Sequence, residues 1–130
     1  RIKEMKNIIN TAFITILLTT CKPEANVKTE LPDPFEAGWN GEKVCEVLED
    51  NDKLRVLKCS FPPGVGHEMH YHNPHFGYAL VGGTFKLAED TGTREVSFPT
   101  GYSWSKNEVS EHQVLNICDS TSVFLIIEYK

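Results

Sequence analysis

The chain has 130 residues, a length typical of one domain, and its 40% hydrophobic and 24% charged residues are ordinary for a globular protein. The formal net charge is −5, and the 13 lysines and arginines are scattered along the chain. A nucleic-acid-binding surface needs clustered basic side chains that neutralise phosphates, so this class of partner is not expected.

The N-terminal residues have the features of an export signal. From Met5 the chain reads MKNIINTAFITILLTTC, in which one lysine precedes an apolar stretch at residues 8–18. This stretch is short for a membrane-spanning helix and has the length of a signal-peptide core. The segment Leu18-Thr19-Thr20-Cys21 resembles a bacterial lipoprotein cleavage box, although Thr20 replaces the usual smaller residue.

We therefore expect residues 1–21 to be an N-terminal extension and signal peptide that ends at a lipidated Cys21. The protein would then be exported and attached to a bacterial membrane only through this lipid. Two alternatives remain, a signal peptide that is cleaved nearby beside an ordinary cysteine, and a buried apolar helix.

Residues 22–40 are predicted to form a flexible tether. They contain three prolines and several acidic residues with little apolar periodicity. Such a segment cannot bury enough apolar surface to offset its ordering entropy. The folded domain is expected to cover residues 41–130.

Short strands separated by turn residues follow from Glu42 onward, and no segment has a helical period of useful length. About eight or nine closely spaced strands predict an all-β sandwich or barrel. The last of them, residues 123–129, is apolar on both faces as far as Glu128, which predicts a position in the middle of the packing. The expected strands are 44–49, 54–61, the histidine-rich segment, 77–81, 84–88, 94–98, 102–105, 112–117 and 123–129.

Three cysteines remain if Cys21 is lipidated, namely Cys45, Cys59 and Cys118. An exported protein permits one disulfide among them together with one free thiol. No pair has the spacing of a metal site. We expect all three to be small buried hydrophobic residues, with the disulfide as the alternative.

Four of the five histidines lie between residues 67 and 75. His70 and His72 are two residues apart, so on a strand they share one face and can bind one transition metal ion. His75 follows the Asn73-Pro74 bend and can turn back toward the same ion. His112 stands alone near the C-terminus.

The histidine-rich segment resembles the first motif of the cupins, small barrels of the double-stranded β-helix type. That motif has a glycine, five residues, His-x-His, a glutamate and a second glycine. In this chain Gly64 is followed by five residues and then by His70-Tyr71-His72. Counting back from Gly82 by the motif's spacing places His75 where the glutamate usually stands.

A second cupin motif follows in order. Gly101 begins it, and His112 and Asn116 stand at the expected distances, with Asn116 expected to support the turn or the barrel wall. Asn107 and Val109 replace the usual proline and glycine. The resemblance implies a single all-β cupin domain over residues 41–130.

The resemblance implies a metal site in which His70, His72 and His112 are the core ligands and His75 is a fourth. Imidazole-rich shells favour Fe(II), which we expect, with Zn, Ni, Cu or Mn as alternatives. Glu68 has the same strand parity as His70 and is the candidate catalytic residue, as a general base, a further ligand or a support for an imidazole. The alternative for Glu68 is an exposed side chain, and His67 is expected at the rim.

Cupins include oxygenases, isomerases, decarboxylases, storage proteins and ligand sensors, so the fold does not decide the function. The histidine ligands, without an obvious Ser, Cys or Lys nucleophile, favour a metal-dependent oxygenase-type enzyme acting on a small organic molecule. The alternative is a non-catalytic cupin that binds a metal or small ligand outside the cytoplasm. Cupins often dimerise through outer strands, so a homodimer is expected, with Tyr71 and Tyr78 on the face opposite the metal.

Overall fold

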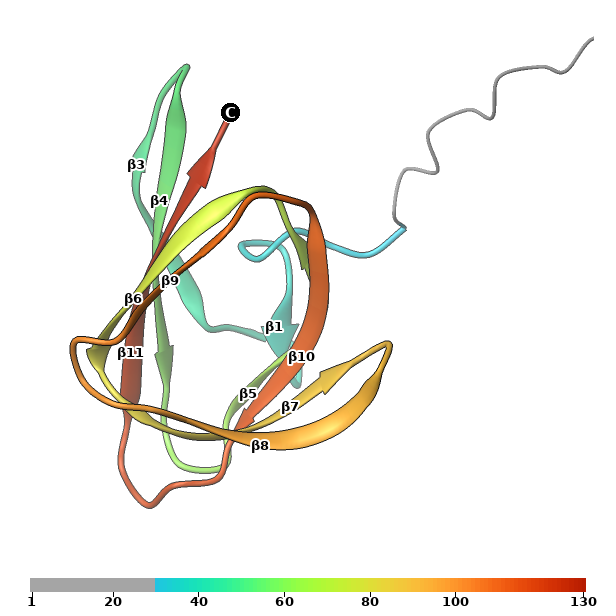
Figure 1. Ribbon diagram of the computed structural model, residues 1–130, viewed down its shortest axis with the longest axis vertical. Helices are drawn as coiled ribbons and strands as arrows, with labels where there is room; N and C mark the ends of the chain where they lie inside the picture. The colour runs from blue at the N-terminus through green and yellow to red at the C-terminus, as the bar shows by residue number, and fades with distance from the viewer. Residues whose placement is uncertain (1–29) are drawn as a thin grey trace, which may run out of the picture.

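A computed structural model describes residues 30–130, which form eleven strands and no helix (Figure 1). Within these residues there is consequently no helix with the length and apolarity of a membrane span. The predicted signal peptide, Cys21 and residues 22–29 lie outside the described part of the chain. The strands are β1 (Gly38–Trp39), β2 (Glu42–Lys43), β3 (Cys45–Asp50), β4 (Leu54–Phe61), β5 (Gly66–His72), β6 (His75–Val81), β7 (Gly83–Glu89), β8 (Gly92–Phe98), β9 (Ser103–Lys106), β10 (Ser110–Asn116) and β11 (Ser122–Tyr129).

Two antiparallel sheets face each other in a jelly-roll-like barrel (Figure 1). One sheet has the order β3-β4-β11-β6-β9 and the other the order β5-β10-β7-β8. The chain crosses between the sheets at Gly82, where β6 ends and β7 begins. The prediction of an all-β barrel is confirmed.

Strand β11 occupies the centre of the five-stranded sheet, as its apolar sequence predicts, and pairs with β4 along its full length. Its inward positions are Ser122, Phe124, Ile126 and Glu128, all buried, and the residues between them are partly buried on the outer face. Glu128 is therefore a carboxylate on the core face of an otherwise apolar strand. A charged group in such a place requires a partner.

The core lies between the sheets and includes a disulfide between Cys45 and Cys59. These residues face each other across β3 and β4, with Cα atoms 4.0 Å apart. The expectation of three unbonded cysteines is therefore wrong for this pair, although both side chains are buried as expected. Cys118 is free and partly buried. The buried cluster consists of Cys45, Leu57, Cys59, Phe61, Ala79, Phe85, Phe124 and Ile126.

The described part of the predicted tether packs against the barrel. The backbone N–H of Tyr71 donates to the carbonyl of Pro32 at 3.2 Å. Asp33 forms an ion pair with Arg55 on β4, with 3.0 Å between Oδ2 and Nη1. The folded domain thus begins before the predicted boundary at residue 41, because backbone and ionic contacts hold this segment and its Pro34 and Ala37 are buried.

A hairpin turn ends this segment. Asn40 and Gly41 join β1 to β2 and both have positive φ, 50° and 84°. Two-residue hairpin turns of this type favour Asn-Gly because glycine, and to a lesser degree asparagine, tolerate positive φ. The Asn-Gly pair is thus a local signal for a structured segment, which the prediction of a tether overlooked.

Candidate metal centre

Three imidazoles converge at one end of the barrel interior. His70 and His72 extend from β5, and His112 extends from β10, where it lies opposite His70 in the strand register. The candidate ligand atoms of the three residues all lie within 4.8 Å of one another. His70 and His72 are buried and His112 is partly buried. The three predicted core ligands are therefore brought together.

The hydrogen-bond partners of the His70 and His72 rings indicate that this cluster suits a cation. His70 Nδ1 donates to the carbonyl of Glu68 at 2.6 Å, which leaves a lone pair on Nε2, 2.9 Å from Nε2 of His72. His72 Nδ1 lies 3.4 Å from Glu128 Oε1, and both atoms are buried without a hydrogen-bond partner among residues 30–130.

A neutral His72 carries one ring proton, so either tautomer leaves a conflict. A proton on Nδ1 makes two Nε2 lone pairs face each other, and a proton on Nε2 leaves a bare Nδ1 facing a carboxylate. A metal ion held by His70 and His72 would remove the conflict, because the ring proton of His72 could then stay on Nδ1 and point toward Glu128. The residues therefore fit a metal ion.

Glu128, which forms an ion pair with Arg55, faces the ring of His72. Glu128 Oε2 accepts hydrogen bonds from Nε and Nη2 of Arg55, at 2.9 and 2.6 Å. Arg55 also donates to Asp33 at 3.0 Å. A carboxylate behind a ligating imidazole fixes its tautomer and raises its basicity. This role of Glu128 was not predicted from the sequence, where its one signal is an acidic residue in an otherwise apolar strand.

Burial is the largest cause of lowered pKa values throughout the histidine cluster. It lowers the pKa of His67 to about 3, with a further contribution from His70. It also lowers the pKa of His72 and His112 well below the usual value, and neighbouring imidazoles reinforce the effect. The rings are therefore neutral at neutral pH, which is the form that binds metals.

A β-bulge in β5 decides which of its residues face inward. His70 lies opposite His112, but His67 lies opposite Val114, so β5 has one more residue than β10 between these points. A bulge of this kind shifts the alternation of side chains by one position. As a result His67 shares the inner face with His70, whereas Glu68 does not.

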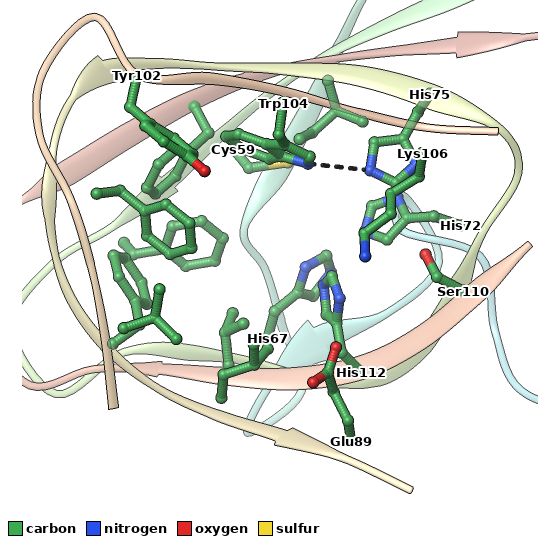
Figure 2. A pocket seen from close by; sticks show the side chains of 18 of the residues that line it. Cys59, His67, His72, His75, Glu89, Tyr102, Trp104, Lys106, Ser110 and His112 are labelled. Carbon is green, nitrogen blue, oxygen red and sulfur yellow. Dashed lines mark hydrogen bonds between the residues drawn. The ribbon is translucent and has the colours of Figure 1, made fainter. Parts of the chain in front are cut away.

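The bulge explains both positions, because Glu68 takes the exposed alternative stated for it, whereas His67 does not lie at the rim as expected. Glu68 is exposed and its Oε1 accepts from the backbone N–H of Asn40 at 3.1 Å, so the side chain does not face the cluster as a catalytic group would. His67, expected at the rim, is 3% exposed and lines the pocket (Figure 2). Its Nε2 donates to the carbonyl of Pro34 at 2.9 Å, which anchors the N-terminal segment.

His75 lies beside the cluster but is directed elsewhere. Its Nδ1 donates to the carbonyl of Asn73 at 2.9 Å, and its Nε2 accepts from the indole N–H of Trp104 at 3.3 Å, the dashed line in Figure 2. The ring centroids of His72 and His75 are 4.7 Å apart. The converging nitrogens do not include those of His75, whose role as a fourth ligand stays a prediction.

A cavity of about 390 Å³ adjoins the cluster, within the size range of small-ligand sites. Histidines line one end of it, Tyr102 lies at the opposite end, and Trp104 lies between them next to His75 (Figure 2). Trp104 packs against Gly77, where an added Cβ would collide with the indole. Gly77 thus provides the space in which Trp104 packs. The aromatic lining consists of Phe61, Phe85, Phe98, Tyr102, Trp104 and Phe124.

The arrangement of the strands matches solved structures of known fold. A cupin domain from Bordetella pertussis has 27% sequence identity and a TM-score of 0.64, and the match covers 78% of this chain and 97% of that one. The chain has the cupin fold.

More distant cupins agree on this fold. A cupin superfamily protein from Desulfitobacterium hafniense is 12% identical, with a TM-score of 0.52, and the match covers 65% of this chain and 74% of that one. A sugar phosphate isomerase from a cupin superfamily of Silicibacter pomeroyi is 18% identical, with a TM-score of 0.54 and coverage of 78% and 68%. No protein-family model and no curated protein matches the sequence.

The cupin barrel gives Asn116 the structural role that the second motif implies. Its Nδ2 donates to the carbonyls of Phe61 and Ser120 at 2.8 and 2.9 Å. Its Oδ1 accepts from the backbone N–H of Cys118 at 2.9 Å. Asn116 therefore fixes the turn that leads from β10 into β11.

Proposed function

We propose that this cupin is a metal-dependent, oxygenase-type enzyme that binds one ion, Fe(II), through His70, His72 and His112. The observation that supports the proposal most is the convergence of three neutral imidazoles at the end of an aromatic pocket. Imidazole ligands suit Fe(II), Zn, Cu, Ni and, less well, Mn. Three protein ligands leave coordination positions for small molecules.

Bound Fe(II) would supply the binding and activation of O₂ at the histidine end of the pocket. The residues of the chain perform the remaining tasks. The aromatic wall, with Phe98, Trp104 and Phe124, packs against the substrate and excludes water from it. Glu128, held by Arg55, keeps the ring proton of His72 on Nδ1 and so leaves Nε2 free to bind the ion.

Oxygen consumption by the iron-loaded protein tests the proposal. The protein is loaded with Fe(II) without oxygen and then exposed to O₂ with a panel of phenols, diketones and thiols. We expect one iron per chain and oxygen uptake with at least one compound. His112→Ala and zinc-loaded wild type are the matched controls and should give none. An iron-loaded protein that consumes no O₂ across the panel would contradict the proposal.

A non-catalytic metal-binding module is the second candidate, and the position of His75 favours it. A fourth imidazole lies 4.7 Å, centroid to centroid, from His72, so His75 is the nearby side chain that could complete the coordination shell. X-ray absorption of the metal-loaded protein distinguishes the two cases. Four imidazoles and no exchangeable water support a binding module, whereas three imidazoles with open positions support the enzyme.

We also propose that the protein is exported, with Cys21 lipidated. The disulfide between Cys45 and Cys59 supports export, because such bonds persist in oxidising compartments. Fractionation of cells and mass spectrometry of the N-terminal peptide test this, with Cys21→Ser as the control. A wild-type chain that stays in the cytoplasm with free thiols would contradict it. The homodimer stays a prediction.

A further inference from the structure

One positive charge in the pocket lacks a counter-ion among the described residues. Lys106, the last residue of β9, is exposed to solvent, lies opposite His75 in the strand register and lines the pocket. Figure 2 shows its side chain directed inward at the end that holds the histidines. Its charge also lowers the pKa of His75, although burial has the larger effect.

The other charged residues of the pocket balance each other. Arg94 and Glu89 form an ion pair with 3.6 Å between Nη2 and Oε2. No ion pair or side-chain hydrogen bond within residues 30–130 engages the ammonium group of Lys106. The pocket thus has one surplus positive charge, although the whole chain has a net charge of −5.

A polar hydroxyl without a partner lies at the same end of the pocket. Ser110 begins β10 and pairs with His72 in the strand register. Its Oγ is buried and has no hydrogen-bond partner in the described part of the chain. Buried polar groups are normally satisfied, so an unpaired hydroxyl that lines a cavity indicates a ligand or water that bonds to it. Figure 2 places Ser110 and Lys106 beside the histidines.

The remainder of the pocket suits an aromatic group. The rings of Phe98, Trp104 and Phe124 pack together along the pocket, with centroid distances of 5.6 to 6.0 Å among these three, and the indole of Trp104 extends to His75. Ring pairs at such separations attract one another, and a bound ring can join them. A cavity of about 150 Å³ holds benzene. The observed volume of about 390 Å³ has room for a ring and a short acidic side chain.

We infer that the pocket binds a small aromatic carboxylate, whose carboxylate contacts Lys106 and Ser110 beside the histidine cluster and whose ring packs against Phe98 and Trp104. This inference rests on the proposed function only in taking the bound acid to be the substrate of the same metal centre. The charge and the ring together define the ligand class, since neither a neutral aromatic nor a polar sugar satisfies both ends.

Calorimetric titration with matched acids and amides tests the inference. The probes are benzoate, phenylacetate and 3-phenylpropionate, each beside its neutral amide, with metal-free and zinc-loaded protein. We expect at least one acid to bind more tightly than its amide by about tenfold or more, since a charge-assisted contact is lost in the amide. Lys106→Met should remove this preference, and Lys106→Arg should retain it.

Lys86→Met is the matched control, because Lys86 is an exposed lysine of β7 outside the pocket lining. It should leave both affinities unchanged. Three results would overturn the inference, namely equal binding of acids and amides, an unchanged preference in Lys106→Met, and no binding of any acid. An unchanged preference in particular would mean that Lys106 only contacts solvent.

Failure of the inference and failure of the oxygenase proposal are separable. Acid binding that depends on Lys106, without O₂ uptake by the iron-loaded protein, would leave the ligand class standing and remove the oxygenase. Conversely, O₂ uptake with neutral compounds only would leave the oxygenase standing and remove the carboxylate ligand.

Discussion

Replacing Glu128 with glutamine probes how the protein prepares His72 for a metal. Arg55 needs an acceptor, so the amide oxygen of the glutamine takes the place of Oε2, which accepts from Arg55 at 2.6 and 2.9 Å. The amide NH₂ then faces Nδ1 of His72, where Oε1 lies 3.4 Å away in the wild type. A donor at this point favours the His72 tautomer that carries its proton on Nε2. In that tautomer Nε2 has no lone pair available for a metal ion.

The expected loss of metal affinity is about 10- to 100-fold, the usual effect of removing a partner behind a metal ligand, or about 1.4 to 2.7 kcal/mol. The metal-free protein should lose less than the 3–5 kcal/mol typical of breaking a buried ion pair. The reason is that Arg55 keeps both Asp33 and the amide oxygen. A chromophoric chelator that competes for Zn(II) measures the affinity, and urea unfolding measures the stability.

Glu46→Gln is the control, because Glu46 is an exposed carboxylate paired with Lys58 on the outside of the barrel. It should change neither quantity measurably. If Glu128→Gln binds zinc as tightly as the wild type, the tautomer argument is refuted. If it loses affinity only in proportion to a loss of folded protein, Glu128 acts on stability and not on His72.

Three further predictions concern pH, the disulfide and His75. The histidine pKa values are lowered in the folded state, so the unfolded chain takes up protons first as the pH falls. The free energy of unfolding of the metal-free protein should therefore be highest above about pH 6.5 and decrease below it, by up to about 1.4 kcal/mol per pH unit for each histidine. Urea titrations across this range would contradict the burial argument if they gave a flat profile. Reduction of the Cys45–Cys59 bond, which spans 14 residues, should destabilise the protein by about 3 kcal/mol in thermal unfolding with reductant, while Cys118→Ser changes little. His75→Phe should still bind one metal ion per chain, since its Nε2 faces Trp104, and loss of the ion would place His75 in the shell.

Most of the barrel could be predicted from the sequence, because the alternation of apolar and polar side chains along a strand is a local pattern. Residues 54–61 were expected as a strand and are strand β4, and residues 123–129 fall within the central strand β11. The His-x-His spacing placed His70 and His72 on one face, and the second motif supplied His112. Period-two patterns and glycine spacings decide such features without reference to the rest of the fold.

The orientations of Glu68 and His67 could not be predicted in the same way. Strand parity places Glu68 with His70 only in a regular strand, and the bulge breaks that regularity. The bulge depends on the register of β5 against β10, which lies some 40 residues further along the chain. Local sequence contains no clear signal for it.

Glu128 and the disulfide depend on distant pairing as well. Glu128 meets Arg55 through the register of β11 against β4, and it meets His72 of β5 only when the two sheets face each other. Cys45 meets Cys59 only because the register of β3 against β4 places them opposite each other. Three cysteines allow three pairings, and sequence does not choose among them.

Metal titration of the purified domain tests the central claim, that His70, His72 and His112 hold one ion. Metal-free wild type and His112→Ala are titrated with Zn(II) and Co(II), and X-ray absorption of the loaded protein identifies the ligands. We expect one ion per chain bound by imidazole nitrogens in the wild type, and loss of tight binding in the variant. Absence of stoichiometric binding in the wild type, or equal binding in His112→Ala, would contradict it.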